Sequence, residues 1–300
     1  MNIGIVGLGK MGNAIAFRLL EAGHNVIGYD RGEEPQKLAG QMGVTLADDL
    51  ADLAKQTRVI WLMIPISAVD AVVDELKPHL KANDIIIDGG NSYYEDSMRR
   101  AKAVATDGII FLDCGTSGGI AGRLGGFCLM VGGDEAAYTK IHSLLVAIAA
   151  PGGLGHVGPS GTGHYVKMIH NGIEYGLLQA YAEGFQIIKE GTFKKMGLDL
   201  EEISRIWNEG SIIRSFLLGL AHEVFEEGQA LSDVSGEIAE GGTGKWTVQE
   251  AKKHHLSVPV IENALKVRAW SRESGGDYAT KVIAMLRHKF GGHEVKRKKG

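Results

Sequence analysis

Short runs of consecutive apolar residues recur through the first half of the chain, and helix-type patterns fill the intervals between them. Continuous apolar runs of this kind are typical of parallel strands that are buried on both faces. We therefore predict an α/β domain with a mostly parallel sheet over residues 1–160. Its strands are expected at 2–6, 26–29, 58–64, 84–88, 109–113 and 127–131, with a last strand and a linker at 151–159.

The second half of the chain has a different pattern. From Gly161 onward the strand signals end and long helical periodicities take over, so residues 161–300 are predicted to form an all-helical domain. A chain of 300 residues is long enough for two such domains, each with its own core.

One predicted helix, which begins near Gly161, collects reactive side chains. At 100° per residue, four polar residues share one narrow face: Lys167, His170, Asn171 and Glu174. The back and the flanks are apolar, and they include Tyr165, Val166, Met168, Ile169, Ile173 and Leu177, with the small residues Gly172, Gly176 and Ala180. Such a helix is expected to be buried in a larger assembly, with its polar stripe lining a cavity. A solvated stripe on a surface helix is the alternative.

The first predicted strand runs into a glycine-rich turn, GLGKMG, at residues 7–12. A GxGxxG turn alone is a weak signal, but here it lies between a strand and a helix, and Asp30 ends the second strand. That context predicts a Rossmann-like dinucleotide-binding fold, in which free N–H groups at the start of the helix bind the phosphates. A glycine turn that binds nothing is the alternative. The predicted cofactor contacts in this turn are Gly7, Leu8, Gly9, Lys10, Met11 and Gly12.

Asp30 bears on which nicotinamide the site accepts. Its carboxylate can accept hydrogen bonds from the ribose hydroxyls of the adenosine and would repel a 2′-phosphate, which favours NAD. Arg31 follows directly and is able to reach a 2′-phosphate, so the use of NADP stays open. A surface side chain is an equally good interpretation of Arg31.

Two further turns follow predicted strands at their carboxyl ends. They are DGGNS at residues 88–92 and CGTSGG at residues 114–119. Open α/β sheets bind their ligands at this edge, so a shared site is expected there. Ordinary loop glycines, and a helix N-cap at Ser92, are the alternatives.

Composition narrows the class of protein. The chain is 44% hydrophobic with a net charge of -4, which argues against a general nucleic-acid binder, and no apolar run reaches the roughly 20 residues needed to span a bilayer. No signal peptide is apparent, and the two cysteines, Cys114 and Cys128, fit a reducing cytoplasm. The histidines and cysteines show no metal-ligand spacing, so no metal is predicted. The basic run 296–299 is interpreted as a solvated, frayed end.

Taken together, these motifs resemble 6-phosphogluconate dehydrogenase, a family of β-hydroxyacid dehydrogenases. The resemblance rests on GLGKMG, DGGNS, GTSGG at 115–119, GHYVKMIHNGIEYG at 163–176 and GGTGKWT at 241–247. Other β-hydroxyacid dehydrogenases look similar in the first two motifs and share the lysine–asparagine pair, but they are not expected to have partners such as His170 and Glu174. An NAD-dependent dehydrogenase or reductase of a small 3-hydroxy acid, of the 3-hydroxyisobutyrate type, is the second interpretation. A non-catalytic nucleotide sensor is the third.

Two departures from the family pattern matter. The chain looks like the short branch, because longer members carry a second helical segment, so a dimer and a tetramer both stay open for the expected homo-oligomer. The second strand ends Tyr29-Asp30-Arg31, where NADP-using members look like Asn-Arg-Thr, which again favours NAD.

The resemblance implies the oxidative decarboxylation of 6-phospho-D-gluconate to D-ribulose 5-phosphate and CO2 in the pentose phosphate pathway, with hydride transfer to NAD(P)+. Lys167 would act first as the base at the C3 hydroxyl and then as the acid at the ketone oxygen. His170 and Asn171 would support it by hydrogen bonding, so that no metal is required, and Glu174 would protonate C1.

The resemblance also assigns the remaining contacts, with residues 161–300 as the substrate and oligomerisation domain. Met63 and Asn91 would contact the cofactor, and Asn91 would also reach the substrate. The substrate carboxylate end would bind Ser117, Gly118 and Gly119. The phosphate would bind Tyr175, Lys245, Thr247 and Arg268. Arg287 and His293 resemble tail residues that in the family reach a neighbouring subunit's site. The tryptophans 207, 246 and 270 are interpreted as packing residues.

Overall fold

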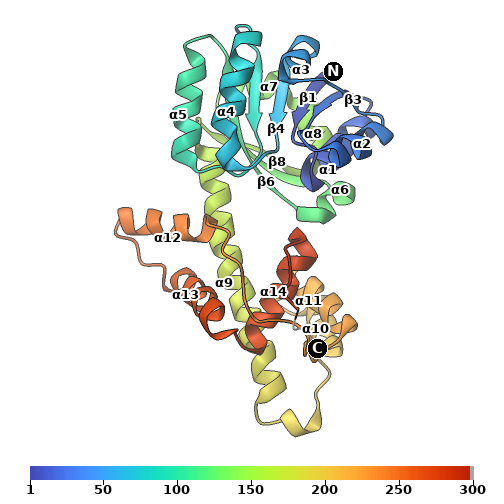
Figure 1. Cartoon of the computed structure of the whole chain (residues 1–300). Coiled ribbons are helices and arrows are strands. Elements are labelled where there is room, and N and C mark those ends of the chain that lie inside the picture. Colours follow the sequence, from blue (N-terminus) through green and yellow to red (C-terminus); the bar gives the residue numbers. More distant parts are fainter. Residues whose placement is uncertain (298–300) are drawn as a thin grey trace. The chain divides into compact units, whose positions relative to one another are not determined.

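The computed structural model describes residues 1–297, so Lys298 and Lys299 of the basic tail lie outside the described residues. The chain divides into two compact units, Met1–Met168 and Ile169–Gly300. The boundary expected from the sequence lies eight residues earlier, after residue 160. Figure 1 shows the strands in the blue-to-green part of the chain and only helices in the yellow-to-red part.

The first unit is built on one eight-stranded sheet in the order β3-β2-β1-β4-β5-β6-β7-β8. Neighbouring strands are parallel except for the pair β6–β7, which is antiparallel, so the expectation of a mostly parallel α/β sheet is confirmed. The strands are β1 (Asn2–Val6), β2 (Asn25–Tyr29), β3 (Thr45–Leu46), β4 (Val59–Leu62), β5 (Ile85–Asp88), β6 (Ile110–Ser117), β7 (Phe127–Gly132) and β8 (Ala149–Gly158).

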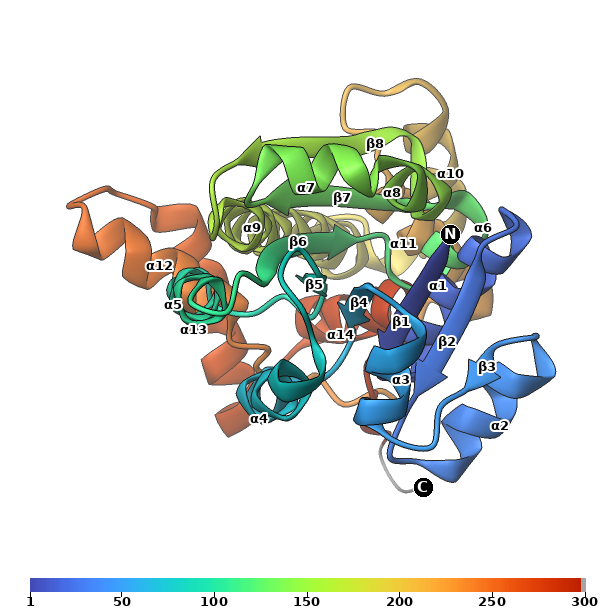
Figure 2. The same cartoon turned by 90° about the horizontal axis from the view of Figure 1, so that it is seen from above.

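Helices cover both faces of the sheet, as the continuous apolar runs require. One core lies between the sheet and helices α1 and α8, and a second lies between the sheet and α3, α4 and α5. Figure 2 shows α7 and α8 alongside β7 and β8, on the side away from α3 and α4. The helices are α1 (Lys10–Glu21), α2 (Glu33–Gln41), α3 (Leu50–Gln56), α4 (Ile66–Leu76), α5 (Tyr94–Ala105), α6 (Gly122–Gly125), α7 (Glu135–Lys140) and α8 (His142–Ile148), with short 3-10 turns η1 (Lys77–His79) and η2 (Gly119–Ala121).

The long helix α9 (Thr162–Glu190) starts in the first unit and continues into the second. The second unit packs its helices around buried side chains such as Phe185, Phe225 and Ile283. These helices are α10 (Leu200–Gly210), α11 (Phe216–Glu227), α12 (Thr243–Lys253), α13 (Pro259–Ser274) and α14 (Tyr278–Gly291), with the 3-10 turn η3 (Lys194–Met196). Within the described residues the regular secondary structure of this unit is helical, apart from one isolated bridge, Val234 to Arg297.

One detail of the sequence interpretation is corrected. Lys296 and Arg297 are exposed but not frayed, because they form ion pairs with Glu237 and Asp233. Helix α9 buries Met168, whereas Val166, Ile173 and Leu177 are exposed in the single chain, so the burial of this helix in a larger assembly stays a prediction. None of the helices among residues 1–297 is long and apolar enough to cross a bilayer.

Candidate functional site

The glycine-rich turn between β1 and α1 uses its three glycines in different ways. A Cβ on Gly7, which has φ +94°, would lie 2.3 Å from the Met63 carbonyl oxygen, and a Cβ on Gly12 would lie 1.9 Å from that of Gly7. These two glycines are required by the fold. Gly9 has an ordinary φ of -65° and a Cβ there would meet no atom within 4 Å. The space beside Gly9 and the uncapped first turn of α1 therefore suit the close approach of a pyrophosphate.

Asp30, at the end of β2, is tied to this turn by hydrogen bonds. Its Oδ2 accepts the Leu8 N–H at 2.6 Å and its Oδ1 accepts the Gly32 N–H at 2.8 Å. Each carboxylate oxygen retains a second lone pair, which suits a ribose hydroxyl. The Arg31 side chain is exposed beside it. The carboxylate is thus fixed where the adenosine end of a dinucleotide would lie.

The two other predicted turns meet at the same edge of the sheet. The Asn91 side chain accepts the Thr116 N–H at 3.2 Å and donates to the Thr116 carbonyl at 3.4 Å. Asn91 itself is left-handed, with φ +58°, a conformation that asparagine tolerates better than most residues. Ser92 is not the N-cap of α5, because its hydroxyl donates to Asp88 at 2.6 Å and the cap position is Tyr93. That alternative is therefore wrong.

Lys167 is buried, with 6% of its surface exposed, and glycines explain how its helix lies so close to the sheet. A Cβ on Gly115 of β6 would lie 2.5 Å from the Lys167 Cβ, and a Cβ on Gly163 would lie 2.4 Å from the carbonyl oxygens of Asp113 and Met130. Any side chain at either glycine would push α9 away from the strands. Ser117 ends β6, and Gly118 and Gly119 follow with positive φ values of 142° and 55°.

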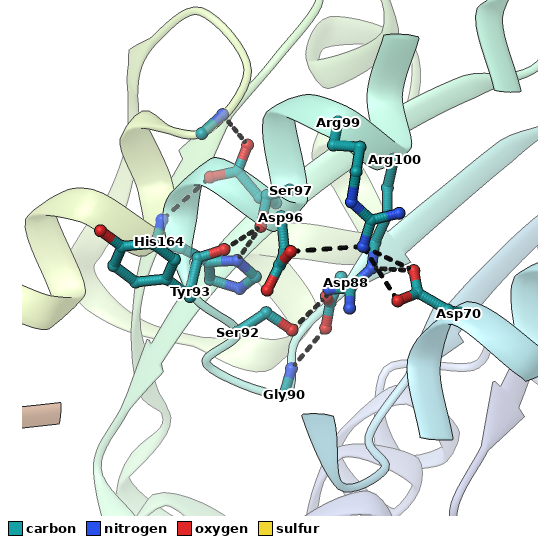
Figure 3. A network of polar contacts seen from close by, with 12 residues as sticks. Asp70, Asp88, Gly90, Ser92, Tyr93, Asp96, Ser97, Arg99, Arg100 and His164 are labelled. Carbon is teal, nitrogen blue, oxygen red and sulfur yellow. Dashed lines mark hydrogen bonds and ion pairs between the residues drawn. The ribbon is translucent and has the colours of Figure 1, made fainter. Parts of the chain in front are cut away.

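The start of α9 is held by a carboxylate that the sequence interpretation missed. Asp113, fully buried on β6, accepts the N–H groups of Gly161 at 2.6 Å and of His164 at 2.9 Å. The His164 ring contacts Ser97 of α5, as Figure 3 shows. A carboxylate at the end of an apolar run, in register with Asp88 of β5, was the available signal, but no pattern in the sequence names its partners.

In the second unit, the next turns of α9 carry His170, Asn171, Glu174 and Tyr175. The His170 Nδ1 and the Asn171 Oδ1 are 3.2 Å apart, and His170, Asn171 and Glu174 are all half-buried. A solvated stripe is therefore not what the structure shows for this face.

Tyr175 is clamped between two elements of the second unit. The Arg268 guanidinium lies 3.3 Å from the centre of its ring, and a Cβ on Gly244 would lie 2.4 Å from the ring's Cε2. Gly244 thus allows α12 to begin against the ring. Thr247 of the same helix is buried against Gly172, whereas Lys245 is exposed.

Two buried arginines face this tyrosine. Arg268 is 2% exposed, and its Nη1 and Nη2 find no hydrogen-bond partner among residues 1–297. Burial lowers the pKa of Arg268 to about 10 against the opposing effects of Tyr175 and Glu174, and the charge of Arg287 acts in the same direction as burial. Arg287 is 6% exposed and donates to the Ala239 carbonyl at 2.8 Å. Burial also lowers the pKa of Arg287, against the opposing effects of Tyr175 and Glu174.

Arg287 interacts electrostatically with Tyr175 and Glu174 of its own chain. The contact with a neighbouring subunit that the resemblance implies for Arg287 stays a prediction. His293 is exposed, and its ring lies edge-on to Phe290 at 6.1 Å, so its place in a site stays a prediction. Trp207 packs against Phe185, as expected of a core residue, whereas Trp270 is 44% exposed.

Comparisons with known proteins follow the same division of the chain. The family described as "NAD binding domain of 6-phosphogluconate dehydrogenase" matches residues 2–172, and "6-phosphogluconate dehydrogenase, C-terminal domain" matches residues 163–299. The chain is 47% identical over 304 residues to the NAD(+)-dependent, decarboxylating 6-phosphogluconate dehydrogenase of Haloferax volcanii, and the match covers 99% of each sequence.

Longer proteins match over part of their length. The decarboxylating 6-phosphogluconate dehydrogenase of Synechocystis is 34% identical, and the match covers 89% of this chain and 60% of that sequence. Among solved structures, the 6-phosphogluconate dehydrogenase of Plasmodium falciparum, described with NADP+ and with 6-phosphogluconate, superposes with a TM-score of 0.82 at 31% identity. That match covers 91% of this chain and 62% of the other.

Proposed function

Because the chain belongs to the 6-phosphogluconate dehydrogenase family, we propose that it oxidises and decarboxylates 6-phospho-D-gluconate to D-ribulose 5-phosphate and CO2, with NAD+ as the hydride acceptor. The observation that carries this proposal is the pair of buried arginines around Tyr175. A small 3-hydroxy acid has no group that needs two such cations, whereas a sugar-acid phosphate has one.

The physical argument concerns the cost of burial. A guanidinium withdrawn from water is unfavourable when two of its nitrogens find no hydrogen-bond acceptor among residues 1–297, so an incoming anion would stabilise Arg268. Phosphate accepts paired hydrogen bonds from an arginine fork, and the Tyr175 hydroxyl and Thr247 add donors. We assign the phosphate end of the substrate to Tyr175, Thr247, Arg268 and Arg287, with exposed Lys245 closing over it and His293 assigned on the resemblance alone.

The first unit supplies the cofactor site. Gly9 with the uncapped start of α1, and Asp30 at the end of β2, fit a dinucleotide. A nicotinamide held there would supply the acceptor for the hydride of C3. We assign the main-chain groups from Leu8 to Gly12, together with Met63 and Asn91, to cofactor contacts. Ser117, Gly118 and Gly119 are assigned to the substrate carboxylate, and Asn91 to a second contact with the substrate.

Proton transfers are assigned to the polar stripe of α9. Lys167 takes the proton of the C3 hydroxyl as the hydride leaves, and then gives it to the ketone oxygen as the C1 carboxylate departs as CO2. His170 and Asn171 support that oxygen by hydrogen bonding. Glu174 protonates C1 of the resulting enediol, which is C2 of the substrate, and Lys167 recovers the enol proton. Lys167 then releases that proton to water and Glu174 takes one from water, so both side chains return to their starting states.

The preference for NAD rests on Asp30, whose negative charge faces the place of a 2′-phosphate. Asp30→Ala is expected to lower the ratio of kcat/KM for NAD+ to that for NADP+ by about tenfold or more, because the like-charge repulsion is removed. The variant also loses the Leu8 and Gly32 hydrogen bonds, so its use of NAD+ falls as well. An unchanged ratio would contradict the assignment.

We also propose an oligomeric state and a cellular location for the protein. Exposed apolar side chains of the second unit, among them Ile173, Ile187, Ile212 and Phe216, favour a homo-oligomer, either a dimer or a tetramer. Cys114 and Cys128 are both free thiols, which suits a cytoplasmic protein.

One assay separates the proposed function from its alternatives. Purified protein is mixed with 6-phosphogluconate and NAD+, and both the absorbance of the reduced nicotinamide and the release of CO2 are followed. Equal amounts of both products are expected. Turnover of 3-hydroxyisobutyrate in preference to 6-phosphogluconate would support the small-acid dehydrogenase, and NAD+ binding without turnover of either would support the sensor.

A further inference from the structure

Helix α5 buries a polar face where an apolar one is expected. Ser97 and Arg100, three residues apart on one side of the helix, are 0% and 3% exposed, and Val104 continues the same stripe. A helix face packed on a sheet is ordinarily apolar, and a buried arginine is costly unless it is paired. The partners of these two side chains therefore indicate what the polar face does.

Arg100 faces two carboxylates from different elements. Its Nε donates to Asp70 of α4 at 2.8 Å, and its Nη1 donates to Asp88 at the end of β5 at 3.4 Å. Asp88 is fully buried, and it also accepts the Gly90 N–H at 3.0 Å and the Ser92 hydroxyl at 2.6 Å. Figure 3 shows Asp88 at the centre of this turn with Arg100 beside it. Arg100 is thus the cation that faces the carboxylate closing the turn 88–92.

That turn holds Asn91. Gly90 and Ser92, which flank it, both donate to Asp88. Asn91 keeps a left-handed backbone, φ +58°, and pairs its amide with both main-chain groups of Thr116. A left-handed non-glycine residue persists only where its surroundings hold it. Loosening the Asp88 contacts would release Asn91 from Thr116.

Ser97 reaches the helix that carries Lys167. Its Oγ lies 2.7 Å from the His164 Nδ1 and 3.3 Å from the Tyr93 carbonyl. A proton on Nδ1 satisfies both contacts, because the ring then donates to Ser97 and the hydroxyl donates to Tyr93. His164 is 1% exposed and its Nε2 has no hydrogen-bond partner among residues 1–297, so Ser97 provides the ring's polar anchor within that range. Lys167 follows three residues later, on the same side of α9.

We propose that the buried face of α5 is a shared support for two site residues of the first unit, Asn91 and Lys167. Arg100 positions Asn91 through Asp88, and Ser97 positions the first turn of α9, and so Lys167, through His164. Arg100 and Ser97 act as positioning residues through these contacts. The importance of Asn91 and Lys167 rests on the proposed function, whereas the contacts themselves do not.

The test pairs each support with its own readout. Arg100→Met is expected to speed hydrogen exchange at the Gly90 and Thr116 amides and leave the His164 amide unchanged, and Ser97→Ala is expected to do the reverse. Each variant should lower kcat for 6-phosphogluconate by about tenfold, because small misplacements of reacting groups are costly. Arg99→Met is the matched control, since Arg99 binds Asp70 and Asp96, not Asp88. It should stay within about twofold of wild type.

Two further variants guard against simple unfolding. Arg100→Lys keeps a cation near Asp88 and should recover part of both kcat and the amide protection. The double variant Arg100→Met with Asp88→Asn removes the unpaired buried charge, so it should fold better than Arg100→Met while Thr116 stays unprotected.

Three outcomes overturn the proposal: unchanged exchange at these amides, faster exchange throughout the sheet with kcat falling only in proportion to unfolded protein, or equal effects from Arg99→Met. Exchange is measured without substrate. A wild type that fails to turn over 6-phosphogluconate but shows the paired exchange pattern would therefore refute the proposed function and leave this support in place.

Discussion

The two units treat buried charge in opposite ways. In the first, the carboxylates of Asp88 and Asp113 are fully buried, and each already accepts at least two hydrogen bonds from neighbouring groups. In the second, Arg268 is equally buried but two of its nitrogens find no acceptor among residues 1–297. The buried carboxylates of the first unit therefore hold its own backbone, whereas the second unit leaves part of a buried cation without hydrogen-bond acceptors, and we propose that an anion supplies them.

The largest effect is expected from removing the amine of Lys167 in the first unit. Lys167→Ala should lower kcat by about 10³-fold or more, because both proton transfers at the C3 oxygen are lost. NAD+ affinity, measured by calorimetry, should stay near that of wild type, since Asp30 and the glycine-rich turn are untouched. A large loss of NAD+ binding would mean that Lys167 holds the structure of the first unit and is not a proton-transfer residue.

Arg268→Met tests whether charge in the second unit is held for an anion. The variant should raise KM for 6-phosphogluconate by about 100-fold. Its free energy of unfolding without substrate should stay within about 1 kcal/mol of the wild-type value, because the desolvation cost of the buried guanidinium is removed together with its contact to the Tyr175 ring. Inorganic phosphate should raise the Tm of the wild type and not that of the variant. A less stable variant with normal KM would show that Arg268 holds the fold.

Asp113→Asn tests the opposite case. The amide keeps one acceptor and turns an NH2 toward an N–H donor, so about 3 kcal/mol of unfolding free energy should be lost. Urea unfolding measures this. The exposed Asp107, paired with Lys77, offers a control, and Asp107→Asn should change little. A tolerated Asp113→Asn would remove the distinction between the units.

The smallest effect concerns pH. The Arg100 hydrogen bond lowers the pKa of Asp70 from 3.8 to about 2. Because the folded-state pKa is depressed, this carboxylate stabilises the fold above about pH 4, and the contribution is lost as the pH falls through about 2. The stability difference between wild type and Asp70→Asn should therefore shrink between about pH 5 and pH 2. A difference that stays constant over this pH range would mean that the ion pair between Asp70 and Arg100 does not stabilise the fold.

Much of the sheet could be predicted from the sequence because parallel strands that are buried on both faces consist of consecutive apolar residues. The run at 2–6 coincides with β1, the run at 84–88 contains β5 (Ile85–Asp88), and the turns that follow them lie where expected. The two-residue β3 leaves no run to detect. The antiparallel direction of β7 was also beyond reach, since an apolar run has the same appearance in either direction.

The site was predictable in its residue types and less so in its partners. The stripe of α9 follows from helical geometry alone. The pairs Ser97–His164 and Asp113–Gly161 are 67 and 48 residues apart, and only the sheet topology brings them together. The exposure of Ile173 and the isolation of Arg268 likewise depend on which helices happen to cover them, which periodicity does not encode.

The open space beside Gly9 separates the residues that the fold needs from a residue that only the nucleotide needs. Gly7 and Gly12 cannot change without disturbing the backbone, but a methyl group at position 9 would have no atom of the chain within 4 Å. A single substitution there would leave a properly folded protein that has lost its nucleotide. Measures of folding or abundance alone would not register such a loss.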